Sequence, residues 1–187
     1  IATLAFTEPS GKWDEAGITA TATNNGGSWA INGTKMFVLD GHTADLVIVA
    51  ARTGKGVSLF AVEGGAAGLT RTALSTMDQT RKQAKLEFAN TPATLLGTEG
   101  DGWAVLSMVL DLAAVGLAAE QVGGAQKVLE QAVEYAKVRV QFGRPLIDFQ
   151  NVQMTIAQMA VQVEAARLLV LRASSEAGDG LPDTKLP

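Results

Sequence analysis

The chain of 187 residues contains no cysteine and a single histidine, His42. The missing cysteines exclude disulfide bonds and thiolate metal ligands, and they fit a reducing compartment such as the cytoplasm. One histidine also excludes a metal site built from several imidazole groups. His42 follows Asp40-Gly41 in a turn-like segment, where a structural or solvated side chain is expected. The sequence therefore predicts no metal site and a cytoplasmic protein.

Long apolar runs and an excess of positive charge are also missing. The chain has 15 Lys and Arg against 19 Asp and Glu, a net charge of −4, which argues against a nucleic-acid surface. Asp111 interrupts the longest apolar stretch, residues 106–119, before it reaches the roughly 20 residues of a membrane span. We expect neither a nucleic-acid partner nor a membrane. Because the chain begins at Ile1 and stops without a closing element, we expect it to be a fragment or the ordered part of a longer chain.

Residues 1–98 are rich in Thr, Val, Gly and Asn, arranged in short alternating runs. Residues 18–23 alternate strictly, which is typical of a half-buried strand. Asn24-Asn25-Gly26-Gly27 predicts a hairpin into residues 28–32, and Asn32-Gly33 predicts a second turn. Further strands are expected at residues 1–7, 34–39, 44–51, 57–62, 69–74 and 85–88. Short strands at this spacing predict an antiparallel β-sandwich or barrel.

Residues 99–187 are predicted to be helical. Asp101 is a suitable N-cap for a helix over residues 103–138, which contain no proline. Residues 105–119 are apolar nearly all round, so we expect them to be buried on most sides. For Gly123-Gly124, which costs helix stability, the expected reason is close approach of another helix. The later apolar positions share one helix face: Val122, Ala125, Leu129, Ala132 and Ala136.

Gly143 and Pro145 should end this helix. A second helix is expected over residues 149–175, ended by residues 177–180. Its apolar residues repeat at spacings of four and three: Val152, Ile156, Met159, Val163, Ala166, Val170 and Ala173. This pattern indicates a bundle seam, and the short connection makes the two helices antiparallel neighbours. The predicted fold class is therefore α+β, a sandwich or barrel domain over residues 1–98 followed by half of an antiparallel helical bundle.

The residues alone leave the chemistry open. Well-understood motifs such as GxxxxGK[ST], HExxH and GxSxG are absent from the sequence. Glu8-Pro9-Ser10-Gly11 is either an ordinary turn or a set of backbone amides that binds an anion. Asp111 is either a surface carboxylate or a buried polar contact to a ligand. Residues 139–142, with Gln150, fit the chemistry of a helix end and turn.

A further pattern comes from four segments taken together. Residues 4–9 read LAFTEP, and residues 29–38 read WAINGTKMFV. Residues 97–103 form a glycine-rich start to the long helix, and residues 135–150 contain Y-x-x-x-R-x-Q-F-G followed by Phe-Gln. In this order and near this spacing the segments resemble the acyl-CoA dehydrogenase family over almost the whole chain. The resemblance implies the family's middle β-domain and half of its C-terminal four-helix bundle.

The resemblance implies FAD-dependent α,β-dehydrogenation of an acyl-CoA thioester, with electron-transfer flavoprotein or another electron acceptor as partner. It implies that three residues, here called the ring-side group, contact the flavin ring: Thr7, Phe37 and Leu39. It also implies a diphosphate cluster that holds the diphosphate and adenosine of a flavin bound by a neighbouring subunit: Arg139, Gln141, Phe142 and Gln150. Asp111 matches a carboxylate that contacts the pantetheine arm, and Trp13 also falls on the substrate side.

The sequence departs from the family pattern at several positions. Leu39 stands where a threonine is usual, Trp13 replaces a serine, and Ala114 replaces an arginine. One position for the catalytic base is occupied by Ala113, and the usual one is expected beyond Pro187. The resemblance therefore implies either an active homotetramer or a partly degenerate subunit of a mixed α2β2 tetramer that completes a partner's flavin site. An interaction module that binds no flavin is a third possibility.

Overall fold

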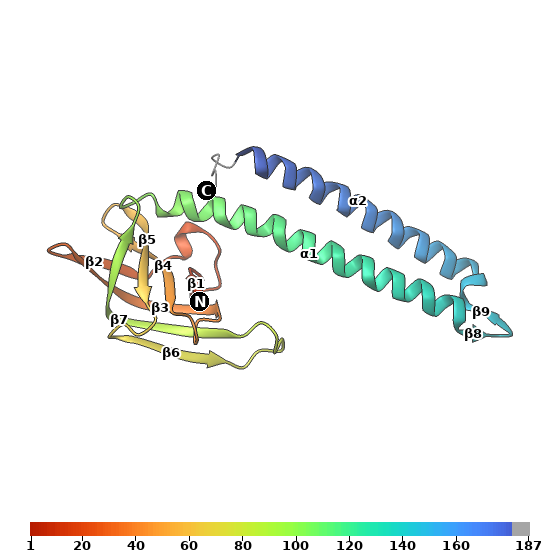
Figure 1. The fold of residues 1–187 in the computed structure, drawn as a ribbon, viewed down its shortest axis with the longest axis horizontal. Helices are drawn as coiled ribbons and strands as arrows, with labels where there is room; N and C mark the ends of the chain where they lie inside the picture. The colour runs from red at the N-terminus through yellow and green to blue at the C-terminus, as the bar shows by residue number, and fades with distance from the viewer. Residues whose placement is uncertain (181–187) are drawn as a thin grey trace. The chain divides into compact units, whose positions relative to one another are not determined.

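The computed structural model describes residues 1–180 and divides into two units, one from Ile1 to Ser107 and one that begins at Met108 (Figure 1). The first unit contains strands β1 to β7 and the start of helix α1. The second contains the rest of α1, the hairpin β8–β9 and helix α2. The predicted α+β class is confirmed, and each unit is described by itself below.

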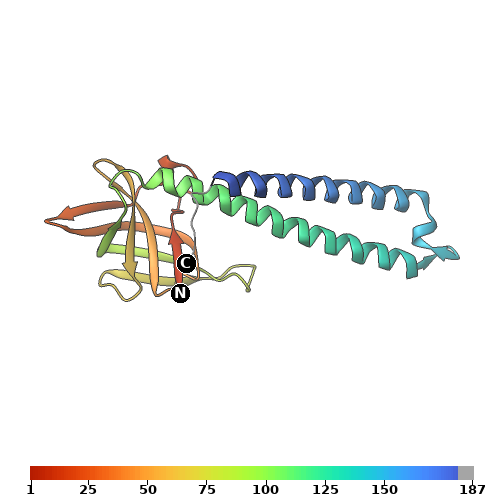
Figure 2. The same cartoon turned by 45° about the horizontal axis from the view of Figure 1, so that its top comes forward.

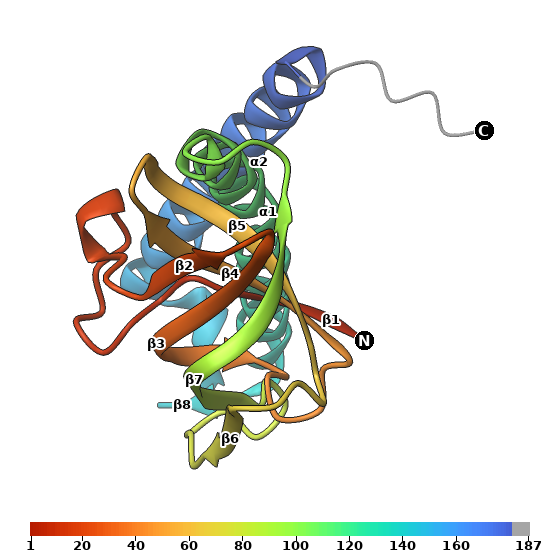
Figure 3. The same cartoon turned by 90° about the vertical axis from the view of Figure 1, so that its left-hand side faces the viewer.

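The first unit is a closed sheet whose strands are β1 (Ala2–Ala5), β2 (Thr21–Asn25), β3 (Ser28–Leu39), β4 (Leu46–Thr53), β5 (Gly56–Glu63), β6 (Leu69–Leu74) and β7 (Gln83–Leu96). The hydrogen-bonded order β4-β2-β3-β7-β5 returns to β4, which makes the sheet a barrel (Figure 3). β1 adds to β4 and β6 to β7. The pairings β1–β4 and β2–β4 are parallel, and the other pairings of this sheet are antiparallel. Closure pairs the edges that an open sheet would expose.

The barrel encloses an apolar core. Alternating residues of β4 and β5 point inward, as the period of two in a strand requires. The side chains with no exposed surface include Val47, Val49, Phe60, Val62 and Leu86. Trp29 packs on Phe60 with ring centroids 5.2 Å apart. The barrel therefore provides a rigid scaffold for the segment between β1 and β2, which contains several of the predicted site residues.

One predicted turn is confirmed and another is wrong. The hairpin at residues 24–27 joins β2 to β3, with both glycines at positive φ. The turn predicted at Asn32-Gly33 does not form, because β3 continues through it to Leu39. Gly33 has φ +142, and a Cβ on it would lie 2.8 Å from the Cα of Ala20. The glycine therefore permits a close backbone approach within a strand rather than a turn.

Two strand limits also differ from the prediction. The strand expected from residue 18 begins only at Thr21, because the backbone before it bonds to side chains: the Arg52 guanidinium donates to the Ile18 carbonyl at 3.1 Å. β7 runs to Leu96, well past the predicted end at Phe88, and its extension pairs with β3 and β5. Neither the Arg52 contact nor the pairing of the end of β7 can be recognised from the alternation of apolar and polar residues along one strand.

The second unit is a helix pair joined by a short hairpin. α1 (Gly102–Val138) matches its prediction closely, and after it come β8 (Val140–Gln141), β9 (Arg144–Pro145), a single 3₁₀ turn and α2 (Gln150–Gly180) (Figure 2). Helix α2 extends beyond its predicted limit near Ser175 and ends at Gly180, the last of the residues predicted to end it. Glycine weakens a helix by about 1 kcal/mol but does not stop one by itself.

The predicted seam of α2 is confirmed. Each residue assigned to it is half-buried: Val152, Ile156, Met159, Val163, Ala166, Val170 and Ala173. The helices are antiparallel neighbours (Figures 1 and 2), and the Arg167 guanidinium donates to Gln126 Oε1 across them at 2.9 Å. On α1 four of the five predicted residues are half-buried or buried, whereas Ala125 is exposed and the unpredicted Gln126 and Val133 are half-buried.

Two expectations for α1 are not met by contacts among the described residues and stay predictions. Residues 105–119 are not buried on most sides: Leu106 is 1% exposed, but Met108 is 44% and Leu117 is 50% exposed. Gly123 and Gly124 mark no close helix contact, since a Cβ on either would meet nothing within 4 Å. Both helices are long and apolar enough to cross a membrane by length and composition, a test that core helices of soluble proteins also pass. The absence of a membrane stays a prediction.

Candidate functional site

The segment that follows β1 is held against β3 by its backbone and by a buried ion pair. Lys35 Nζ lies 2.7 Å from Glu8 Oε1 and also donates to the Phe6 carbonyl at 3.3 Å. The amide of Met36 donates to the Thr7 carbonyl at 2.8 Å. Lys35 is 0% and Glu8 is 3% exposed. Residues 6–8 are therefore fixed to β3 one after another.

Glu8 also organises the strand that arrives from the other side. Its carboxylate accepts hydrogen bonds from the amides of Thr19 at 3.0 Å and Ala20 at 2.9 Å, and from the Thr19 hydroxyl. Burial raises the pKa of Glu8, but the hydrogen bonds from Lys35, Thr19 and Ala20 outweigh it and leave this pKa below its ordinary value. Burial lowers the pKa of Lys35, and Glu8 opposes that shift. The sequence did not predict this ion pair. The one signal for it was that Glu8 and Lys35 each lie in a segment that carries the family resemblance, residues 4–9 and residues 29–38.

A bulge in β3 places the aromatic residue of the ring-side group. Lys35 pairs with Leu86 and Val38 with Ala84, so β3 has one residue more than β7 between these pairs. Phe37 lies in this bulge with a left-handed φ of 57° and a 51% exposed side chain. The bulge leaves the Met36 amide to bond Thr7 instead of β7. Phe37 thus directly follows the residue whose amide bonds to Thr7, which brings the backbones of Thr7 and Phe37 to one patch of the barrel.

Other predicted residues lie in the same unit. Thr7 is buried, whereas Leu39, at the end of β3, is 47% exposed and its carbonyl accepts from Thr3 Oγ1 at 2.6 Å. Trp13 is 63% exposed and its ring meets that of Phe6 edge-on at 4.9 Å. The Gly11 amide donates to the Glu8 carbonyl at 2.9 Å. Because this amide is used inside the turn, the ordinary-turn interpretation of residues 8–11 is favoured.

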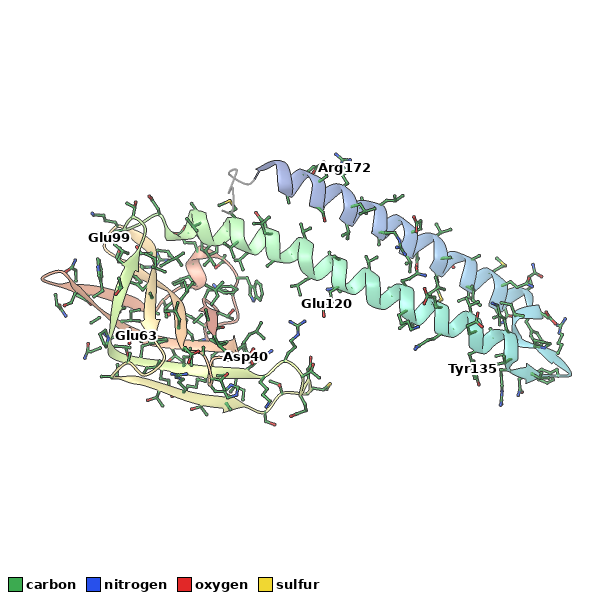
Figure 4. The ribbon with its side chains drawn as sticks, in the orientation of Figure 1. Asp40, Glu63, Glu99, Glu120, Tyr135 and Arg172 are labelled. Carbon is green, nitrogen blue, oxygen red and sulfur yellow. The ribbon has the colours of Figure 1, made fainter. Side chains whose placement is uncertain are left out.

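The diphosphate cluster lies around the hairpin that joins α1 to α2. The Leu146 amide donates to the Arg139 carbonyl at 2.8 Å, which closes the connection. Phe142, at the tip, has φ 51° and is 93% exposed. Arg139, Gln141 and Gln150 are exposed as well, so the hairpin presents all four members of the cluster to solvent. Figure 4 shows Tyr135 on the last turns of α1 near this hairpin.

The hairpin surface is cationic and aromatic. The Arg144 guanidinium lies 4.1 Å from the centre of the Phe149 ring, and the ring centres of Phe142 and Phe149 are 6.5 Å apart. Among the residues that the structure describes, no carboxylate forms an ion pair with Arg139. Such a surface suits an anion attached to a flat ring. Arg144 was not predicted as a site residue, although it pairs with Gln141 across the hairpin.

Asp111 and His42 were not predicted as members of either group. Asp111 is exposed on α1, as are Ala113 and Ala114. His42 is half-buried, its carbonyl accepts from Arg71 at 3.4 Å, and its Nδ1 has no hydrogen-bond partner among the described residues. The structure therefore gives Asp111 the character of a surface carboxylate, and His42 contributes a backbone contact.

Comparisons with known proteins agree with this arrangement. Residues 3–91 match the model of the acyl-CoA dehydrogenase middle domain, and residues 100–186 match that of the acyl-CoA dehydrogenase C-terminal domain. A short-chain specific acyl-CoA dehydrogenase of Megasphaera elsdenii is 37% identical over a match that covers 97% of this chain and 50% of that protein.

Solved structures give the same result. Butyryl-CoA dehydrogenase from Megasphaera elsdenii superposes with a TM-score of 0.90 at 36% identity, covering 97% of this chain and 50% of that one. PigA with FAD and proline superposes with a TM-score of 0.90 at 31% identity over the same shares of 97% and 50%. The chain spans about half the length of the curated relatives it matches. It belongs to the acyl-CoA dehydrogenase family, with which it shares the middle and C-terminal domains.

Proposed function

We propose that the whole protein catalyses the FAD-dependent α,β-dehydrogenation of an acyl-CoA thioester. The observation that carries the proposal is the β8–β9 hairpin, which exposes Arg139 and Phe142 together. An arginine fork suits a diphosphate and an aromatic ring suits a flat base, and FAD contains both groups. The relatives named above include acyl-CoA dehydrogenases and a structure with FAD, which supports the same function.

The described residues fit FAD in both units. In the barrel, the half-exposed ring of Phe37 next to Thr7 would flank the flavin ring. In the helix pair, Arg139 would hold the diphosphate of a flavin bound by a neighbouring subunit, with Gln141, Phe142 and Gln150 beside it. When bound, FAD supplies the acceptor for the hydride that leaves the β-carbon of the substrate.

The substrate side is less complete in this chain. We propose that Asp111 binds the pantetheine arm of the acyl-CoA and that Trp13 borders the substrate. Ala113 is not ionisable and Asp111 is exposed, so neither acts as the base in this proposal. We propose that the carboxylate that removes the α-proton of the substrate lies beyond Pro187 in the whole protein. Residues 1–187 by themselves should therefore show no turnover.

The proposed assembly is a tetramer in the cytoplasm that passes electrons to electron-transfer flavoprotein or to another acceptor. A second candidate is a partly degenerate subunit of a mixed α2β2 tetramer. The observation that favours it is the exposure of Leu39 and Trp13, apolar side chains at positions where the family resemblance implies hydroxyl groups. Such a subunit would lend its diphosphate cluster to a partner's flavin.

The test uses the full-length protein. Its visible spectrum and its turnover with acyl-CoA and an electron acceptor should show bound FAD and dehydrogenation. Arg139→Ala should weaken FAD binding by about 1.5–3 kcal/mol, since it removes charge-assisted hydrogen bonds to the diphosphate. Arg172→Ala is the matched control, because Arg172 projects from α2 and pairs with Glu176 at 2.8 Å (Figure 4). Unchanged flavin occupancy of Arg139→Ala after extensive dialysis would sink the role of the hairpin.

Flavin counting separates the two assemblies. A homotetramer should hold one FAD per subunit and be active when this gene product is expressed alone. A mixed tetramer should hold fewer flavins than subunits, and neither chain should be fully active without the other. Full loading and turnover by this protein alone would end the second candidate.

A further inference from the structure

Glu8 and Lys35 form a fully buried ion pair at the patch of the barrel that contains Thr7 and Phe37. Removing two charges from water costs several kcal/mol each, and apolar side chains of similar volume often stabilise a core as well or better. The pair is therefore poorly explained by core stability alone. Its contacts show what else it determines.

The pair connects three segments that are distant in the sequence. Lys35 donates to the Phe6 carbonyl and to Glu8, which ties the end of β1 to β3. Glu8 accepts from the amides of Thr19 and Ala20, which ties the start of β2 to the same point. Thr7 lies between the two residues that Lys35 contacts, and its own carbonyl accepts from Met36. The backbone of Thr7 is thus fixed from both sides.

The same pair adjoins a strained residue. Phe37 is two residues after Lys35 and has a left-handed φ, which costs a non-glycine residue about 1–2 kcal/mol. Such a conformation persists only where its surroundings over-determine it. The bonds at Lys35 and Met36 hold the bulge on the side towards β1, and the pairing of Val38 with Ala84 holds it on the other.

We propose that Glu8 and Lys35 are positioning residues that set the geometry of the ring-side patch, Thr7 and Phe37, and thereby the affinity and electronic environment of the bound flavin. The proposal rests on the proposed function. Neither residue is exposed enough to touch a ligand, so both act through their neighbours. Their removal should change flavin binding more than it changes folding, because two neutral side chains of similar size also avoid the cost of buried charge.

The experiment compares the full-length protein with its Glu8→Gln/Lys35→Met double variant, both freed of FAD and then titrated with it. FAD fluorescence gives the dissociation constant, the visible absorption band reports the environment of the flavin ring, and melting of the apoprotein reports folding. We expect the double variant to melt cooperatively, to bind FAD about tenfold or more weakly, and to shift the absorption band. The matched control is Lys55→Met/Glu99→Gln, which removes an ion pair of 3.1 Å on the barrel surface and should bind FAD as the wild type does.

Thr19→Val is the second variant, in case the double variant does not fold. It removes one hydroxyl donor to Glu8 at an exposed residue and should weaken FAD binding by about threefold to tenfold. Wild-type affinity and an unshifted absorption band in the folded variants would overturn the inference while leaving the proposed function intact. A wild-type protein that binds no FAD would overturn both. A control pair that weakens binding as much as the buried pair would also overturn the inference.

Discussion

The barrel and the helix pair use apolar residues in opposite ways. In the barrel the inward-facing apolar side chains of β4, β5 and β7 lose their exposed surface, as Phe60 and Leu86 do. In the helix pair one face of each helix meets the other, and large residues elsewhere stay exposed: Met154, Val161, Leu168, Leu169 and Leu171. A group of large apolar side chains exposed on one helix normally marks an interface. The barrel therefore encloses an apolar core of its own, whereas the two helices bury only the faces that meet each other.

The largest expected effect is self-association through the exposed apolar residues of the helices, which tests the difference between the helices and the barrel. A polypeptide of residues 1–187 should self-associate, because Leu168 and Leu169 are 59% and 68% exposed next to other apolar residues. Sedimentation velocity should show oligomers or aggregates. Leu168→Glu/Leu169→Glu should reduce them more than Ser174→Glu/Ser175→Glu, which adds the same charge at exposed polar positions of α2. A monodisperse monomer of the unmodified polypeptide would count against incomplete packing of the helices.

The next effect concerns the completeness of the barrel. Gly33→Ala should lower the free energy of unfolding by about 2–4 kcal/mol, since a Cβ would collide with backbone and φ is unfavourable for alanine. The clash is with Ala20, whose Cβ would be 2.6 Å from the new atom. Gly26→Ala is the control: its φ is +71 but no atom lies within 4 Å, so only about 1 kcal/mol is expected. Equal losses in urea denaturation would show that the close approach contributes nothing.

The buried carboxylate of Glu8 gives the stability of the barrel a pH dependence. Because the pKa of Glu8 is lowered from 4.5 on folding, its contribution is present above pH 4.5 and is lost as pH falls through the folded-state pKa. Glu8→Gln should destabilise the protein at neutral pH by leaving Lys35 unpaired. The difference in unfolding free energy between wild type and variant should shrink below pH 4.5. A difference that is constant from pH 3 to pH 7 would contradict the assignment.

The smallest expected effect is a change in stability that tests whether the exposed face of α1 is free of close contacts. Gly123→Ala should raise the free energy of unfolding of the full-length protein by about 0.5–1 kcal/mol, the usual gain inside a helix. No described atom within 4 Å would oppose the new methyl group. Thermal melting measures the change, with Ala125→Gly as the reverse substitution on the same helix. A loss of stability would show that another surface packs closely on Gly123, as the sequence analysis expected.

Sequence patterns predicted those features of the fold that depend on residues close together in the sequence. The α2 seam was assigned residue by residue, because one helix face buries wherever its apolar side chains repeat. The Asn-Gly at residue 33 was mistaken for a turn, since a glycine needed for close approach carries the same signal as one needed for a reversal. At residues 24–27 the glycines have open space around them and positive φ, so there the same signal marks a true turn.

In the candidate site, too, features formed by residues close in sequence were predicted, and features formed by residues distant in sequence were not. The diphosphate cluster was predicted from the family resemblance, and its members lie close together because Arg139, Gln141 and Phe142 are near one another in sequence around one hairpin. The pairing of Glu8 with Lys35 depends on how β1 lies against β3, which no local pattern specifies. The bulge at Phe37 was missed for the same reason, because an extra residue in a strand is defined only by its partner strand.

The tip of the β8–β9 hairpin has a consequence for binding entropy. Phe142 is 93% exposed, yet its backbone is set by a left-handed φ and by a connection closed between Arg139 and Leu146. Ordering a flexible side chain on binding costs about 0.5–1.5 kcal/mol. Here the ordering of the hairpin backbone is complete when the chain folds, which leaves only the side chain of Phe142 to be ordered on binding. A flat partner therefore meets an aromatic side chain on a backbone that is already ordered, so binding need not order the hairpin backbone.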